Sequence, residues 1–110
     1  MWKLEGNKLK NKADLWNSDD AWSLEKKNML VYVVKNIESN KVLGVKRPVD
    51  KQMKVIQQDF EEDNFYGSDQ LWKKGDPNAE GYFILEHYVL RRTLTAISTN
   101  SLEIKGKNLS

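Results

Sequence analysis

The apolar residues of this chain occur in short runs that are separated by Gly, Asn, Asp, Ser and Pro. The longest such run, Met29–Val34, has six residues, and no long segment has the i, i+3, i+4, i+7 spacing of an amphipathic helix. Many short strands at regular spacing are typical of an all-β domain. The pattern predicts strands at Trp2–Glu5, Lys8–Lys12, Trp22–Lys26, Leu30–Lys35, Val42–Val45, Lys54–Asp59, Leu71–Lys74, Tyr82–Glu86, Leu94–Ile97 and Leu102–Lys105.

Length and charge narrow the class of protein. The 110 residues predict a single domain spanning 1–110. The net charge of +2 is too balanced for a dedicated nucleic-acid binder, so we expect no specific nucleic-acid partner. We also expect no membrane span, because a run of six apolar residues is far too short to cross a bilayer. With no cysteine and no visible signal peptide, a cytoplasmic protein and a secreted one whose leader was removed both fit.

A tryptophan-led segment recurs along the chain. Trp2-Lys3-Leu4-Glu5 is followed twenty residues later by Trp22-Ser23-Leu24-Glu25, and Trp72 lies fifty residues after Trp22. The segment 28–58 aligns with 80–106, and the distances from Asn36 to Leu43 and from His87 to Leu94 are both seven residues. The segment 7–22 fits the same pattern with shorter loops. The sequence therefore predicts three copies of one structural unit.

Each unit is predicted to have four strands, with the tryptophan at the start of the fourth. The third unit ends at Leu102–Lys105 without a fourth strand, while Trp2–Glu5 precedes the first unit. The simplest closure uses Trp2–Glu5 as the missing strand, which removes exposed strand edges. We expect either a monomer closed in this way or a homodimer in which this strand is swapped between chains.

These units resemble the repeats of ricin-type (R-type) β-trefoil lectins. Gln70-Leu71-Trp72 is the Q-x-W signature of that family, and Gly81–Glu86 and Thr93–Ala96 resemble the first two strands of its repeat. Trp2–Lys12 resembles its W-x-x-x-G-x-l-x-n stretch. The resemblance implies an all-β, β-trefoil-like fold of three pseudo-threefold four-strand units closed by the N-terminal strand. It also implies a non-enzymatic, lectin-like domain that binds carbohydrate or a glycoprotein.

The sugar site of such a domain combines a carboxylate, amides and an aromatic face. The family typically places an aspartate just after the second-strand leucine, where this chain has Gly44, Thr95 and Trp16. Other polar and aromatic residues of units two and three are therefore the candidate ligand-binding residues. They are Gln57, Asp59, Asn64, Tyr66, Asp69, Gln70, His87 and Tyr88. For Gln70 the alternative is a bridge between backbone groups, and for Asp59 it is the end of a strand.

We expect no enzyme, no metal site and no cofactor. The chain has one histidine, no cysteine and no G-x-S-x-G nucleophile motif. An alternative function is a protein- or acidic-polysaccharide-binding trefoil module whose sugar sites are degenerate. Its candidate basic surface consists of Lys41, Lys46-Arg47, Lys51, Lys54 and Arg91-Arg92.

Overall fold

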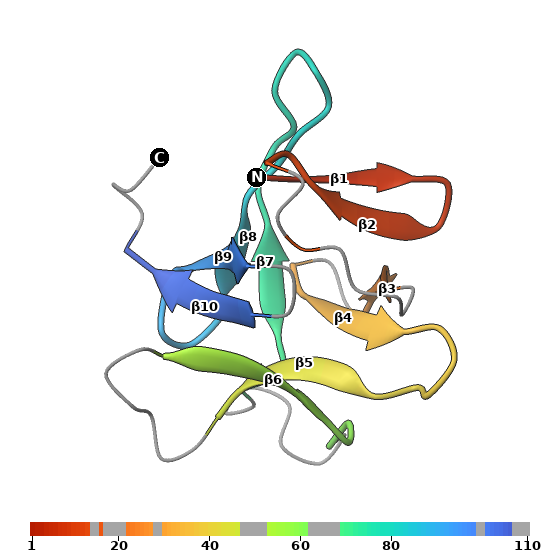
Figure 1. Ribbon diagram of the computed structural model, residues 1–110, viewed down its shortest axis with the longest axis vertical. Helices are drawn as coiled ribbons and strands as arrows, with labels where there is room; N and C mark the ends of the chain where they lie inside the picture. The colour runs from red at the N-terminus through yellow and green to blue at the C-terminus, as the bar shows by residue number, and fades with distance from the viewer. Residues whose placement is uncertain are drawn as a thin grey trace.

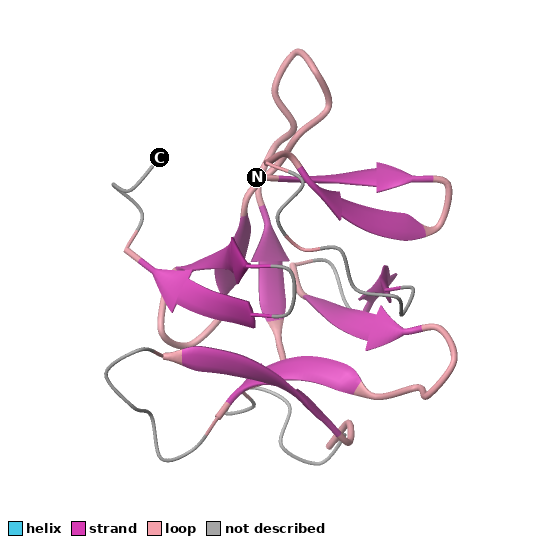
Figure 2. Ribbon diagram, viewed as in Figure 1, coloured by secondary structure: helices cyan, strands magenta, loops and turns pink. Residues whose placement is uncertain are grey.

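The computed structural model describes residues 1–13, 16, 22–27, 30–46, 53–61, 69–98 and 101–106. This part of the chain consists of strands, turns and loops, and no helix occurs in it (Figure 2). The prediction of an all-β protein is confirmed. The strands are β1 (Trp2–Glu5), β2 (Lys8–Asn11), β3 (Trp22–Lys26), β4 (Tyr32–Asn36), β5 (Val42–Val45), β6 (Lys54–Gln58), β7 (Trp72–Lys74), β8 (Leu85–His87), β9 (Thr93–Ser98) and β10 (Ser101–Lys105).

Eight of these strands form one antiparallel sheet that curls on itself. Its order is β3-β4-β5-β6-β10-β9-β8-β7, and an additional pairing of Tyr32 with Trp72 joins β4 to β7. This pairing closes β4 to β10 into a barrel, with β3 lying beside β4 outside the ring (Figure 1). Closure protects strand edges that would otherwise be open to pairing with another chain.

The remaining two strands, β1 and β2, form a hairpin. Its two-residue loop begins with Gly6, whose φ of 61° is the backbone conformation that such loops require at this position. The hairpin reaches the rest of the molecule through Trp2, which exchanges two 2.7 Å backbone hydrogen bonds with Phe83. The N-terminal strand thus joins the third predicted unit of its own chain.

Seven of the ten predicted strands have different bounds in the structure. Five of them differ by one residue at one or both ends, and the other two differ by more, each for a local reason. The apolar run suggested a strand from Leu30, but β4 begins at Tyr32, because Leu30 lies exposed in a bend. The predicted strand Tyr82–Glu86 is divided between two partners. Phe83 bridges to β1, whereas Leu85–His87 pairs with β7.

Tryptophan side chains dominate the larger of two hydrophobic cores. Trp2, Trp22 and Trp72 are all buried in it. The indole of Trp2 donates a 3.0 Å hydrogen bond to the carbonyl of Leu94, and the indole of Trp72 donates one of 3.1 Å to the carbonyl of Leu43. Leu94 and Leu43 occupy equivalent positions in the sequence alignment, so two of the three tryptophans make the same contact.

The third buried tryptophan, Trp22, has different surroundings. Its indole nitrogen is buried and meets no hydrogen-bond acceptor within the described part of the chain. Instead, Trp16 packs between Trp22 and Trp2, with ring centroids 5.8 and 5.6 Å away respectively. Aromatic pairs at such separations attract beyond simple area burial. Three tryptophans therefore form one cluster on this side of the core.

The strand that follows each tryptophan-led strand ends on a polar side chain opposite the tryptophan. The pairs in register are Trp2 with Asn11, Trp22 with Asn36, and Trp72 with His87. Each of these polar residues accepts a hydrogen bond from a backbone N–H in the turn that follows. The contacts are Ala13 to Asn11 at 2.9 Å, Glu38 and Ser39 to Asn36 at 3.0 and 2.9 Å, and Leu90 to His87 at 3.0 Å.

No segment of the described chain forms a helix long and apolar enough to traverse a bilayer.

Candidate functional site

The Q-x-W glutamine, Gln70, is buried and hydrogen-bonds to the segment that follows β6. Its amide nitrogen donates to the carbonyl of Asp59 at 2.7 Å and to the side-chain oxygen of Gln58 at 3.0 Å. Its own oxygen accepts from the N–H of Glu61 at 3.0 Å. These are the bonds of a structural bridge, the alternative that the sequence left open for this residue.

This bridge covers Gly44, the position at which the ricin-type lectins that the sequence resembles typically have an aspartate. A Cβ atom at Gly44 would lie 2.2 Å from the side-chain oxygen of Gln58 and 3.1 Å from Cγ of Gln70. Gln58 is fixed there because its amide also donates to the carbonyl of Val45 at 3.2 Å. The space that an acidic side chain would need in the second unit is therefore filled by the two glutamines.

Gly44→Ala is expected to lower the free energy of unfolding by about 1–3 kcal/mol, because Gln58 must move and abandon its bond to Gln70. The loss of stability caused by Gly44→Ala should be smaller when Gln58 is also replaced with alanine. Urea denaturation of the unchanged protein, the two single variants and the double variant would measure this difference. Gly106→Ala is the control, since nothing lies within 4 Å of the added carbon. Equal stability of the Gly44 and Gly106 variants would contradict this account.

His87 is fully buried rather than open to a ligand. Because the N–H of Leu90 donates to Nδ1, the other nitrogen, Nε2, donates to the carbonyl of Asp69 at 3.0 Å. The ring also meets Trp72 edge-on, with centroids 5.2 Å apart. His87 thus takes the turn-stabilising position that Asn11 and Asn36 hold at the ends of β2 and β4.

The remaining predicted site residues are scattered. Gln57 is exposed on β6 and accepts a hydrogen bond from the Ser39 hydroxyl at 3.1 Å. Tyr88 is half-buried against the smaller core of Val31, Val33, Val42 and Leu71. Asp59 is exposed, and Asp69 is half-buried near His87. Asn64, Tyr66, Arg47 and Lys51 lie outside the described residues.

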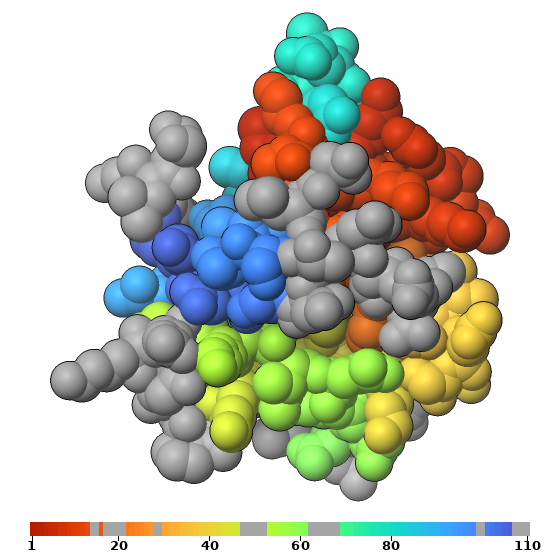
Figure 3. All heavy atoms as spheres, in the orientation of Figure 1, coloured from red at the N-terminus to blue at the C-terminus, as the bar shows by residue number. Residues whose placement is uncertain are grey.

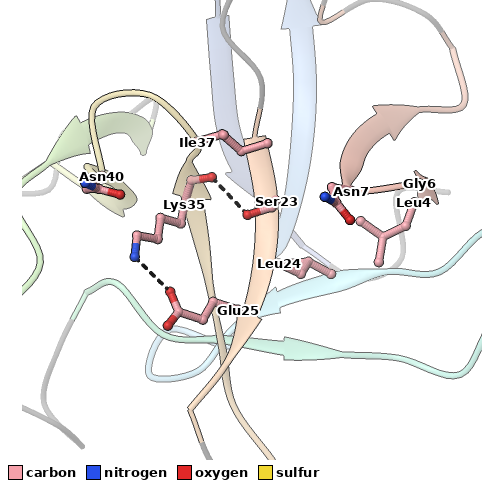
Figure 4. A pocket seen from close by; sticks show the side chains of 9 residues that line it. All are labelled: Leu4, Gly6, Asn7, Ser23, Leu24, Glu25, Lys35, Ile37 and Asn40. Carbon is pink, nitrogen blue, oxygen red and sulfur yellow. Dashed lines mark hydrogen bonds and ion pairs between the residues drawn. The ribbon is translucent and has the colours of Figure 1, made fainter.

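A groove that the sequence did not suggest lies over β3 (Figure 4). This first groove has a volume of about 470 Å³, and the β1–β2 hairpin forms one side of it. In Figure 3 the atoms of that hairpin, in red, lie above those of the β4–β5 turn, in yellow. The groove is lined by Leu4, Gly6, Asn7, Ser23, Leu24, Glu25, Lys35, Ile37 and Asn40.

Charges and amides face this groove together. The Glu25 carboxylate is 3.2 Å from Nζ of Lys35 and 3.3 Å from Nζ of Lys27. The hydrogen bond from Lys35 holds the pKa of the Glu25 carboxyl below its ordinary value, so the group is an anion at neutral pH. Asn7 and Asn40 contribute amides from opposite sides of the groove (Figure 4).

Apolar atoms complete the lining of the first groove. Leu4, Leu24 and Ile37 present aliphatic side chains beside the polar groups. Within the described residues no group of three or more His, Cys, Asp or Glu side chains is placed to hold a metal ion. The arrangement suits reversible binding of a small polar molecule that also has an apolar face.

Comparison with known proteins gives information on the fold. No family model matches the chain, and no curated protein matches it. Among solved structures the chain is similar to the crystal structure of a designed 3-fold symmetric protein, ThreeFoil, with a TM-score of 0.66. The similarity covers 99% of this chain and 91% of that one at 17% sequence identity, so it concerns the fold alone. The chain thus has a β-trefoil-like all-β fold, and no match to ricin-type lectins accompanies this likeness.

Proposed function

We propose that the protein is a non-enzymatic binding domain that holds a saccharide in the first groove. The observation that carries the proposal is the combination of an ionised carboxylate, an ammonium group, two amides and aliphatic side chains in one open groove. A sugar offers hydroxyl groups that donate and accept hydrogen bonds, together with an apolar C–H face. Glu25 would accept from hydroxyl groups, while Lys35 and the amides would donate to them.

The size and lining of the groove indicate the kind of ligand. A volume of about 470 Å³ suits one or two sugar rings. The described lining contains aliphatic but no aromatic side chains, so stacking on a sugar face would be weaker than in an aromatic site. We therefore expect modest affinity for a single ring and better binding to a multivalent glycan.

We also propose the ricin-type organisation of three four-strand units closed by the N-terminal strand. Supporting it are the equivalent indole contacts of Trp2 and Trp72, and the matching registers opposite Asn11, Asn36 and His87. The second strand predicted for the first unit lies outside the described residues except for Trp16. A ligand role for Asn64 and Tyr66 stays a prediction.

A glycan array at low and at physiological salt tests the function. A neutral-sugar signal that persists at both salt concentrations is the expected result. Asn40→Gly should then weaken binding about tenfold. It removes an amide without backbone strain, because Asn40 has a φ of 64°, which glycine adopts freely.

Glu25→Gln should weaken binding to a similar extent. The control is Glu103→Gln on β10, which makes the same chemical change at a position that does not line the groove. Sugar binding that survives both groove substitutions would refute the first groove as the site. A blank array would instead favour a protein partner. Binding that is restricted to sulfated glycans would favour the acidic-polysaccharide alternative.

A further inference from the structure

A second groove lies at the position in the third unit that the first groove occupies in the second. It has a volume of about 290 Å³ and runs beside β7 and β8, which are adjacent in Figure 1. It is lined by Lys73, Lys74, Gly75, Ile84, Glu86 and Arg91.

The strand registers establish that the two grooves correspond. Ser23 follows Trp22 and pairs with Lys35, and Lys73 follows Trp72 and pairs with Glu86. The two residues that follow Ser23 and Lys73 along the chain also line the respective groove.

The turns beside the two grooves correspond as well. Asn40 lies four residues after Asn36 and donates to its carbonyl at 3.0 Å, and Arg91 makes the same bond to His87 at 2.9 Å. Asn40 and Arg91 also share the left-handed backbone conformation, with φ values of 64° and 59°.

The charges of the two grooves differ. In the first groove the charge of Lys35 is balanced by Glu25, whereas three cations and one carboxylate line the second. Glu86 is paired with Nε of Arg91, and Lys74 lies over the ring of Phe83, 4.7 Å from its centroid. Lys73 is exposed, and the Arg91 side chain is 62% exposed, so both can reach a ligand.

The conformation of Arg91 adds a second observation. A left-handed backbone is favourable for glycine and tolerable for asparagine, but it strains a long side chain such as arginine. The third unit nevertheless has arginine where the second has asparagine. The strained residue places its side chain in the lining of the second groove, together with the two lysines of β7.

We infer that the second groove is an anion site that binds the sulfate group of an acidic saccharide. Lys73 and the free face of the Arg91 guanidinium would contact the sulfate oxygens, and Lys74 would add positive potential. The small volume fits a single sulfated sugar ring rather than a nucleic-acid duplex. The site uses no residue of the first groove, so it stands whether or not that groove binds a neutral sugar.

The test is a salt-controlled titration of the full chain with a sulfated oligosaccharide of defined length. The double variant Lys73→Ser/Arg91→Asn places in the second groove the residues that the first groove has at the same positions. The backbone accepts asparagine here, so the variant should fold. The control Lys8→Ser/Lys10→Ser removes the same charge from exposed positions on β2.

We expect the groove variant to weaken binding at least about tenfold, because two charged contacts are lost, and the control to change it less than about twofold. The desulfated oligosaccharide should not bind. Equal losses in both variants, tighter binding of a single-stranded DNA oligonucleotide, or no binding of the sulfated probe would overturn the inference. A blank neutral-sugar array alongside binding of the sulfated probe would reject only the proposed function of the first groove.

Discussion

Replacing Trp2 with alanine is expected to lower the free energy of unfolding by about 3–5 kcal/mol, the usual cost of removing a buried tryptophan from a core. The side chain is fully buried at the second residue of the chain, and its indole donates to the carbonyl of Leu94. A domain of this size has about 5–15 kcal/mol of stability in total, so the variant should be close to unfolding. Urea or thermal denaturation would measure the change.

Two further variants of β1 separate the causes. Trp2→Phe keeps most of the packing and removes the hydrogen bond to Leu94, so we expect a loss of about 1–3 kcal/mol. Leu4→Ala, in the same strand but 38% exposed, should cost less than about 1 kcal/mol. A Trp2→Ala variant as stable as Leu4→Ala would show that the N-terminal strand does not close the fold.

His87→Ala is expected to cost about 2–4 kcal/mol. The substitution leaves a cavity against Trp72 and removes the hydrogen-bond partners of the Leu90 N–H and the Asp69 carbonyl. His87→Asn should cost markedly less, because asparagine performs the same role at Asn36. Denaturant unfolding of the two variants would give the difference.

Val89→Ala is the control for His87, since it lies in the same turn and is 43% exposed. It should change stability by less than about 0.5 kcal/mol. Equal losses for His87→Ala and His87→Asn would contradict the assigned role in the turn, because the packing against Trp72 would then account for the whole effect.

The strands could be predicted from the sequence because their signals are local. The bounds of β1, β3 and β5 were predicted without error, since in each an apolar residue begins a short run that is followed by turn residues. The repeat alignment also placed Leu43 and Leu94 at equivalent positions, and in the structure the carbonyl of each accepts a hydrogen bond from a tryptophan indole. The sequence did not reveal the isolated bridge between Phe83 and Trp2. That pairing depends on where the β1–β2 hairpin, which is distant in sequence, packs against the rest of the chain.

The candidate sites were harder to predict, because both grooves are formed by cross-strand neighbours. Glu25 and Lys35 are ten positions apart in sequence, and only the register of β3 with β4 brings them together. The resemblance to ricin-type lectins pointed instead to Gly44 as the position of a ligand-binding aspartate. There the side chains of two glutamines fill the space that an acidic side chain would need. The signal that could have located the grooves was the equivalence of Asn40 with Arg91, each four residues after the polar end of its strand.

The bond between Trp2 and Leu94 joins residues 92 positions apart, and this separation orders events during synthesis. The first strand leaves the ribosome together with β2, but long before its distant partners Phe83 and Leu94 exist. At translation rates of about 5–20 residues per second, the Trp2 indole waits roughly 5–20 s for Leu94 to be made. A chaperone or a neighbouring nascent chain can contact this apolar side chain in that interval. The final closure of so long a loop is also expected to make folding slow, in the range of about milliseconds to seconds.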